Sequence, residues 1–188
     1  AAEARMRTIL TTVPGAAEAG VLDAGSGSGA IAIGLASRLA GSGTRVTALE
    51  GSPHAWPYLL RNVARSGLPI EPRFGRIGDP RPLGGARYAL IASNPPYIPE
   101  ACLPLDPEVR LFDPEPALYS GPDGLDAVRV LVRFAARRLL PGGAILLEHD
   151  ERQGRSVRAL LDAAGLVQSR TEADLNGRDR VSSALRAR

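Results

Sequence analysis

The sequence contains no lysine, a single cysteine and few aromatic residues. All 23 basic residues are arginines, and none of them form a block, so the net charge of +3 gives little support for a nucleic-acid-binding surface. With Cys102 alone, an internal disulfide and a cysteine-built zinc site are both excluded. Aromatic residues make up 4% of the chain, which is sparse for a protein that stacks on bases.

Long apolar runs are also missing. No stretch is long enough to span a membrane, and the first fifteen residues are too polar for a signal peptide, so we expect a cytoplasmic protein without membrane contact. The length of 188 residues fits one domain with a well-buried core. The chain begins without methionine, as expected of a processed or excised piece of a longer protein.

Apolar strands and amphipathic helices alternate along the chain. Strands are expected at 21–24, 45–50, 70–74, 88–92, 144–149, 166–174 and 180–187. Helices are expected at 2–11, 30–40, 125–140 (stopped by Pro-Gly-Gly) and 152–165, and from an N-cap at Ser52 to a stop at Gly67. The alternation predicts an α/β fold with a mostly parallel sheet covered by helices on both faces. We treat 1–188 as one domain, with 1–19 as N-terminal helix and linker and 94–124 as an irregular substrate-side loop.

A glycine-rich turn joins the first strand to the first helix. Its residues Gly25, Ser26, Gly27 and Gly29 let a ligand approach the backbone near a helix N-terminus. The spacing also fits a dinucleotide fingerprint, with Glu50 ending the next strand where an acid holds ribose hydroxyls.

Asp23, just before this turn, helps to decide between cofactors. Its carboxylate would repel a pyrophosphate, whereas it favours S-adenosylmethionine, which carries an ammonium and a sulfonium. For Asp23 alone, capping of the helix explains the residue equally well. After the third strand, Asp79 and Pro80 are placed to contact an adenine, although Gly-Asp-Pro is also good turn chemistry.

The segment Asn94-Pro95-Pro96-Tyr97 follows the fourth strand directly. Two prolines make it stiff, so the Asn94 side-chain oxygen and the Pro95 carbonyl can each accept an N–H from a planar NH₂ group. These bonds would orient the nitrogen toward the methyl donor, and Tyr97 could stack on the planar group. An isolated Asn-Pro is usually a turn, but a whole Asn-Pro-Pro-Tyr after a buried strand favours a catalytic role. We therefore expect Asn94, Pro95 and Tyr97 to be catalytic, Asn94 to Tyr97 to bind substrate, and no metal.

Five segments together resemble the release factor glutamine N5-methyltransferases. They are DAGSGSGAIAIGLA (23–36), NPPYIPE (94–100), VRLFDPEPALYSGPDGLDAVRVL (109–131), LLPGGAILLEHDERQG (139–154) and GRDRV (177–181). Asn-Pro-Pro-Tyr alone is shared with adenine-N6 methyltransferases. The segment 112–125, FDPEPALYSGPDGL, is specific to a smaller group of methyltransferases, and it points to the glutamine branch.

The resemblance implies a class I methyltransferase with a Rossmann-like, mostly parallel seven-stranded sheet. S-adenosyl-L-methionine would be the donor and S-adenosyl-L-homocysteine the product. The implied partner is a peptide chain release factor, methylated on the glutamine of its Gly-Gly-Gln loop. By position, Asp23 and the turn glycines lie under the methionine part of the donor, Glu50 holds the ribose, Asp79 and Pro80 the adenine, and 94–97 the glutamine amide. Asn94 lies at the boundary of the donor and substrate sites.

One departure from the family pattern leaves the identity of the methyl acceptor undecided. The family carries a small helical domain ahead of the catalytic one, and that domain is not in this sequence, so the chain is either an excised catalytic domain or a relative with another acceptor. Three alternatives remain: an adenine-N6 DNA or RNA methyltransferase, an N-methyltransferase of a small molecule or another protein, and a catalytically silent module that only binds the donor.

Overall fold

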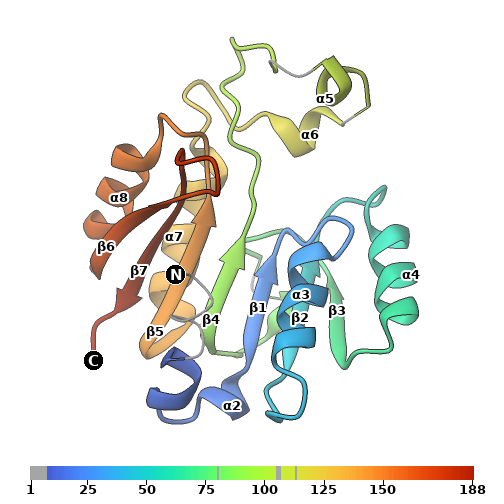
Figure 1. Cartoon of the computed structure of the whole chain (residues 1–188), viewed down its shortest axis with the longest axis vertical. Coiled ribbons are helices and arrows are strands. Elements are labelled where there is room, and N and C mark those ends of the chain that lie inside the picture. The colour runs from blue at the N-terminus through green and yellow to red at the C-terminus, as the bar shows by residue number, and fades with distance from the viewer. Residues whose placement is uncertain (1–7, 80, 105–106, 113) are drawn as a thin grey trace.

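The computed structural model describes residues 8–79, 81–104, 107–112 and 114–188. Its sheet has seven strands in the order β3-β2-β1-β4-β5-β7-β6 (Figure 1). The strands are β1 (Val21–Ala24), β2 (Val46–Glu50), β3 (Ile70–Phe74), β4 (Tyr88–Ser93), β5 (Leu139–Glu148), β6 (Leu166–Ala173) and β7 (Asp179–Arg186). Strand β7 is antiparallel to both β5 and β6, and the other pairs are parallel. The predicted α/β fold with a mostly parallel sheet is confirmed.

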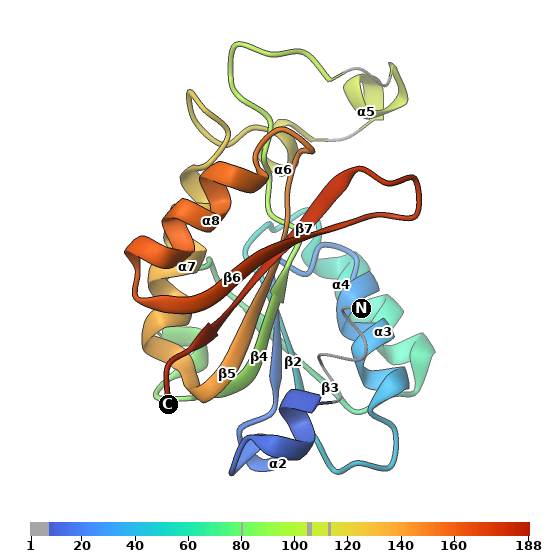
Figure 2. The same ribbon diagram turned by 60° about the vertical axis from the view of Figure 1, so that its left-hand side comes forward.

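Helices cover both faces of the sheet. One face carries α2 (Ala16–Ala19), α3 (Ala30–Arg38) and α4 (Trp56–Ser66), and the other carries α7 (Asp126–Arg138) and α8 (Gly154–Ala163) (Figures 1 and 2). Between β3 and β4 lies the short 3₁₀ helix η1 (Arg81–Leu83). Two further short helices, α5 (Pro107–Phe112) and α6 (Glu115–Leu118), stand above the carboxyl ends of the strands (Figure 1).

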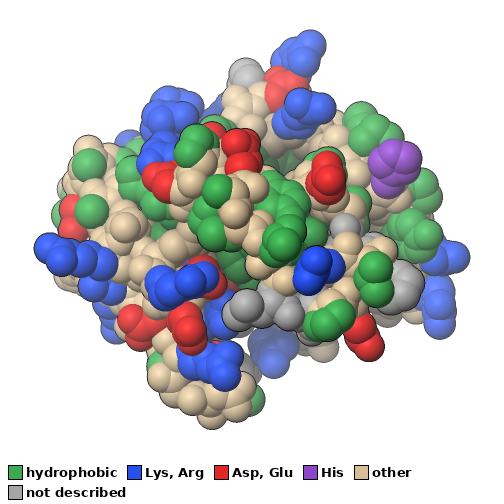
Figure 3. All heavy atoms as spheres, turned by 90° about the horizontal axis from the view of Figure 1, so that it is seen from above, with side chains coloured by type: hydrophobic (Ala, Val, Ile, Leu, Met, Phe, Trp, Pro, Cys, Tyr) green, Lys and Arg blue, Asp and Glu red, His purple; other side chains and the backbone are tan. Residues whose placement is uncertain are grey.

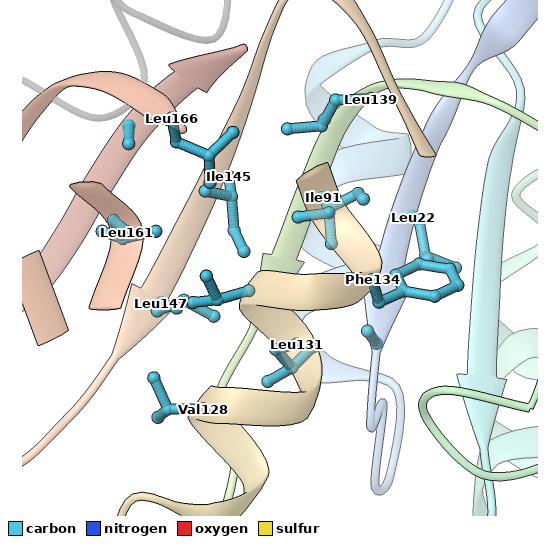
Figure 4. Close-up of a cluster of buried hydrophobic side chains, with 14 of the residues drawn as sticks. Leu22, Ile91, Val128, Leu131, Phe134, Leu139, Ile145, Leu147, Leu161 and Leu166 are labelled. Carbon is cyan, nitrogen blue, oxygen red and sulfur yellow. The ribbon is translucent and has the colours of Figure 1, made fainter. Parts of the chain in front are cut away.

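The core consists of two apolar clusters, one on each face of the sheet. On one face, Leu131 and Phe134 of α7 pack toward Leu22, Ile91 and Ile145 of the sheet (Figure 4). A fully buried leucine contributes about 1.5–3 kcal/mol relative to an exposed one, so these clusters fix the layers that carry the loops at the carboxyl edge. The described residues contain no helix long and apolar enough to cross a membrane.

The predicted start of α4 was wrong. The helix was expected from an N-cap at Ser52, yet it begins at Trp56 with Pro57 in its first turn. Ser52 instead forms the turn ahead of the helix, where its hydroxyl oxygen accepts the Ala55 N–H at 3.3 Å. The predicted stop at Gly67 is confirmed, because this residue ends α4 with φ of 64°.

Other boundaries also differ from the prediction, by one or two residues for β2, β4, β6, β7, α3, α7 and α8, and by more at the start of β5. The Pro141-Gly142-Gly143 stop lies inside β5, which begins at Leu139, and the β4–β5 register shifts between Tyr88 and Leu90 to accommodate it. The span 94–124, expected to be irregular, contains α5 and α6. Of the helix predicted at 2–11, residues 8–11 are helical, and the remainder lies outside the described residues.

Candidate functional site

The carboxyl ends of β1, β2 and β4 meet at one edge of the sheet. Asp23 of β1 is in register with Ala48 of β2 and Ala92 of β4, so the segments that follow these strands emerge side by side. Ligands of open α/β sheets bind at this edge. From above, this face shows hydrophobic side chains in its middle with acidic and arginine side chains around them (Figure 3).

The glycine turn is held against β2 by backbone bonds. The N–H groups of Gly25 and Ser26 donate to the Leu49 carbonyl at 2.8 and 2.9 Å. Gly25, Gly27 and Gly29 have φ of 77°, 56° and 92°, a region that side chains disfavour. A Cβ at Gly29 would also lie 2.8 Å from Leu59 Cδ1. The backbone conformation therefore favours glycine at all three positions, and at Gly29 the lack of space does so as well.

Glu50 ties the end of β2 to this turn. It is 7% exposed; its Oε2 accepts the Gly27 N–H at 2.7 Å, and its Oε1 accepts the Ser52 N–H at 2.6 Å. A carboxylate oxygen has two lone pairs, so each oxygen keeps capacity for one further donor. The arrangement fits a pair of ribose hydroxyls at the position that the sequence predicted.

Asp23 is fully buried beneath the turn. Its Oδ2 accepts the Ala32 N–H in the first turn of α3 at 2.9 Å, so the expected capping role is present. Its Oδ1 is buried and has no hydrogen-bond partner among the described residues. Burial raises the pKa of Asp23 to about 6; the nearby Ser26 side chain and the hydrogen bond from the Ala32 N–H oppose the shift, and the Glu50 charge adds to it. The Ser26 hydroxyl itself donates to the Asp23 backbone carbonyl at 3.0 Å. An unpaired acceptor at this position fits a cationic ligand group, so Asp23 supports both of its predicted roles.

The segment after β3 lies beside the glycine turn. The Gly75 N–H donates to the Glu50 carbonyl at 2.9 Å, and a Cβ at Gly25 would lie 3.3 Å from Ile77 Cδ1. The Asp79 carboxylate is bound by the Arg81 guanidinium at 2.8 Å, and the hydrogen bonds from Arg81 lower the pKa of Asp79. Its oxygens thus already have a partner where an adenine amine was expected. Pro80 lies outside the described residues.

The segment Asn94 to Tyr97, which we call the acceptor loop, is anchored at both ends. Before it, the Ser93 hydroxyl donates to the Ala24 carbonyl at 2.5 Å, which joins β4 to β1. After it, Ile98 forms a parallel bridge with Tyr119. Within it, Pro95 is buried and Asn94 is exposed, and the Asn94 side chain makes no hydrogen bond inside the described ranges. The amide of Asn94 is therefore available at a fixed point of the edge.

The sequence prediction missed Gln153, the residue before α8. Gln153 is 9% exposed, and its Nε2 donates to the Tyr97 carbonyl at 3.0 Å and to the Asp123 carbonyl at 3.2 Å. The resemblance already included the Gln-Gly pair at 153–154, but one sequence gives no reason to connect it with residue 97.

Glu148, at the end of β5, was also missed. Burial raises its pKa, and burial together with the Glu148 charge raises the pKa of Tyr97. Glu148 and Ser93 line a cavity of about 410 Å³ whose other walls are largely apolar residues of α3, β4 and β5. A half-buried carboxyl thus lies on the acceptor side of the edge.

Known proteins bear on this arrangement. No protein-family model matches the chain. It is 45% identical over 170 residues to a release factor glutamine methyltransferase of Deinococcus radiodurans, which covers 89% of this chain and 58% of that protein. It is 42% identical over 164 residues to one of Geobacter sulfurreducens, covering 87% and 56% of the two chains. Over nearly its whole length, the chain is thus homologous to release factor glutamine methyltransferases. It spans 58% and 56% of the lengths of these two relatives.

Solved structures support the same fold. The chain matches a methyltransferase from Pyrococcus furiosus with a TM-score of 0.63 at 18% identity, covering 100% of this chain and 84% of that one. It matches a ribosomal protein L11 methylase from Lactobacillus delbrueckii with a TM-score of 0.62 at 17% identity, covering 98% and 77%. The predicted family and the class I methyltransferase fold are therefore confirmed, while the role of each site residue remains a prediction.

Proposed function

We propose that this chain is the catalytic domain of an S-adenosylmethionine-dependent methyltransferase that acts on the side-chain amide nitrogen of a protein glutamine. The acceptor we propose is the glutamine of the Gly-Gly-Gln loop of a peptide chain release factor. The observation that carries the proposal is the exposed Asn94 amide on a stiff, doubly anchored loop beside the glycine turn. Identities of 45% and 42% to enzymes named for this reaction support it.

On the donor side, this chain supplies one cation-binding position and one hydroxyl-binding position. S-adenosylmethionine supplies a methyl group activated by its sulfonium. Asp23 Oδ1, which is buried without a partner, would accept from the ammonium of the donor. The Glu50 oxygens would accept from the ribose hydroxyls while they hold Gly27 and Ser52. We keep Asp79 and Pro80 as proposed adenine contacts, which requires Asp79 to exchange its Arg81 partner.

On the acceptor side, the chain orients a weakly nucleophilic nitrogen. The Asn94 side-chain oxygen and the Pro95 carbonyl each accept one amide N–H, which fixes the nitrogen lone pair and favours the positive charge that develops on it. Pro96 and Tyr97 are half buried beside them and would cover the planar amide. A water-poor pocket strengthens both hydrogen bonds.

Transfer also releases one proton. As the N–CH₃ bond forms and the S–CH₃ bond breaks, the nitrogen acquires a charge that is removed when an N–H proton leaves. In the sheet, Leu147 of β5 pairs with Ser93 of β4. Glu148 and Asn94 are the residues that directly follow the two members of this pair. We propose the Glu148 carboxylate, or water next to it, as the proton acceptor.

The test is methyl transfer to a release factor, read by mass spectrometry of the Gly-Gly-Gln peptide. The expected result is one added methyl on the glutamine, lost in Asn94→Ala and retained in Gln168→Ala, an amide-to-alanine control at an exposed position of β6. Calorimetry should show similar donor binding in all three proteins. Modification of an oligonucleotide instead of the release factor would establish the adenine-N6 alternative, and donor binding without transfer to either would refute the proposed activity.

A further inference from the structure

Gln153 makes a set of contacts that its place in the chain does not require. It stands at the N-cap of α8, where a side chain ordinarily caps its own helix, yet the Gln153 side chain makes no such bond. Instead, its Oε1 accepts the Asp150 N–H at 3.1 Å, while its Nε2 donates to the carbonyls of Tyr97 and Asp123. The three groups come from three separate segments of the chain.

These segments are the ones that surround the acceptor loop. Tyr97 ends the loop itself, and Asp123 belongs to the 118–124 segment, which pairs with residues 98–100 just after the loop. Asp150 follows β5. The two paired segments are also joined by the Ile98 N–H to the Leu118 carbonyl (2.8 Å) and the Ser120 N–H to the Ile98 carbonyl (3.0 Å). Gln153 therefore links the acceptor loop and the 118–124 segment directly to the segment that follows β5.

The fit around Gln153 is close. A Cβ at Gly124 would lie 2.2 Å from the Tyr97 carbonyl oxygen and 2.8 Å from Gln153 Nε2, so the three groups leave no room for a side chain at 124. Gln153 is 9% exposed, and a buried amide whose donors and acceptor are all engaged is costly to replace. Asparagine is one methylene too short to span the same groups, and glutamate has no N–H donor at neutral pH.

We propose that Gln153 is a positioning residue for methyl transfer: by holding the Tyr97 and Asp123 carbonyls together, it fixes the acceptor loop so that Asn94 and Pro95 present the acceptor nitrogen to the donor. This role rests on the function proposed above. It acts through the loop and touches neither donor nor acceptor, so it should alter turnover much more than donor affinity. A loop displaced by about 1 Å can lower turnover on the order of 100-fold.

The first experiment compares Gln153→Ala with wild type under saturating donor and release factor. We expect kcat to fall on the order of 10–100-fold while the donor Kd measured by calorimetry changes less than about threefold. The control is Gln168→Ala, the same substitution at an exposed position of β6. Hydrogen exchange, followed by mass spectrometry, should accelerate at 98–100 and 118–124 in Gln153→Ala and stay unchanged in the β1–β2 half of the sheet.

A second variant separates positioning from general loss of stability. In Gln153→Glu the carboxylate cannot donate to either carbonyl, whereas its protonated form can donate its one O–H to one of them, so kcat relative to wild type should recover in part as the pH is lowered from about 8 to about 5.5. The charged groups around this position, Asp150 with Arg152, Asp123 with Arg129, and Arg180 of β7, are shared with wild type. The ratio of the kcat of Gln153→Glu to that of wild type therefore reports the protonation of residue 153 alone.

The outcomes distinguish the two proposals. Wild-type kcat in Gln153→Ala, or exchange that is unchanged at 98–100 and 118–124, would overturn the positioning role and leave the proposed function standing. If wild type transfers no methyl to the release factor, the proposed function fails, and hydrogen exchange alone decides whether Gln153 holds the loop. A loss of donor binding equal to the loss of turnover would also overturn the inference, because it would place the effect of Gln153 on the donor side.

Discussion

Replacing Asp23 with asparagine should stabilise the free protein while it weakens the donor site. Burial raises the pKa of Asp23 from its ordinary value of 3.8 to about 6, so ionising this carboxyl costs about 3 kcal/mol more in the folded protein than in the unfolded chain. Asparagine keeps the acceptor for the Ala32 N–H and carries no charge. Its NH₂ group would occupy the position of Oδ1, which is buried without a hydrogen-bond partner among the described residues, so this variant replaces a buried charge with a neutral amide.

The sign of the pH dependence follows from proton binding. Between about pH 4 and pH 6 the folded protein holds the Asp23 proton and the unfolded chain releases it, so the free energy of unfolding falls as the pH rises through this window. Below this pH window Asp23 is protonated in both the folded and the unfolded protein. Above it Asp23 is ionised in both, and the folded protein bears the full cost of the buried charge. Asp23→Asn has no such loss. Its stability relative to wild type should therefore increase by about 3 kcal/mol from about pH 4 to pH 7, or roughly 6–12 °C in Tm.

Urea unfolding, followed by circular dichroism at several pH values, measures this difference. The control is Asp162→Asn, the same substitution at an exposed position of α8. A difference between Asp23→Asn and wild type that does not change with pH would refute the reasoning, because the other titrating groups are common to both proteins. In wild type, donor affinity should also decrease below about pH 6, where Asp23 becomes neutral and attracts the ammonium less. In Asp23→Asn the affinity should be lower by about 10–100-fold and should lack that pH dependence.

Three further substitutions test the site and the core. Gly124→Ala should reduce methyl transfer on the order of 10-fold or more, because its Cβ would lie 2.2 Å from a carbonyl oxygen of the acceptor loop; Gly177→Ala, with a similar φ and open space, measures the cost of the conformation alone. Glu50→Gln should weaken donor binding measured by calorimetry about tenfold or more, since one of its two backbone N–H bonds would face an NH₂ group. Leu131→Ala should lower the free energy of unfolding in urea by about 2–5 kcal/mol, while Leu175→Ala at an exposed turn should change it by less than about 0.5 kcal/mol.

The sequence predicted the sheet well because its strands carry strong local signals. β1 was predicted to the residue and β4 to within one residue, since each is a short apolar run bounded by glycine or polar residues. β3 was also placed correctly, although its sequence IEPRF is a weak strand signal. Helix starts were less predictable. Ser52-Pro53 is an ordinary signal for the start of a helix. The helix nevertheless begins about one turn later, at Trp56, with Pro57 in its first turn.

The site was predictable where it follows a strand, and unpredictable where it depends on long-range contacts. Asp23, Glu50 and Asn94 each lie at a strand end, so the parallel sheet alone brings them to one edge. The contact between Gln153 and Tyr97 joins residues 56 positions apart, and no local pattern encodes it. The Asp79–Arg81 ion pair was equally invisible, because it depends on the path of a connection that is too irregular to predict.

The pairing of 98–100 with 118–121 has a consequence for how the segment between them can vary in evolution. The Glu100 N–H donates to the Gly121 carbonyl at 3.0 Å, so the intervening residues form an excursion whose two ends are held together. Doubling the length of a closed loop costs only about 0.6 kcal/mol in chain entropy. The excursion can therefore lengthen, shorten or be exchanged during evolution without displacing Asn94. On the function proposed above, new residues in this excursion would allow a different acceptor while Asn94 keeps its position.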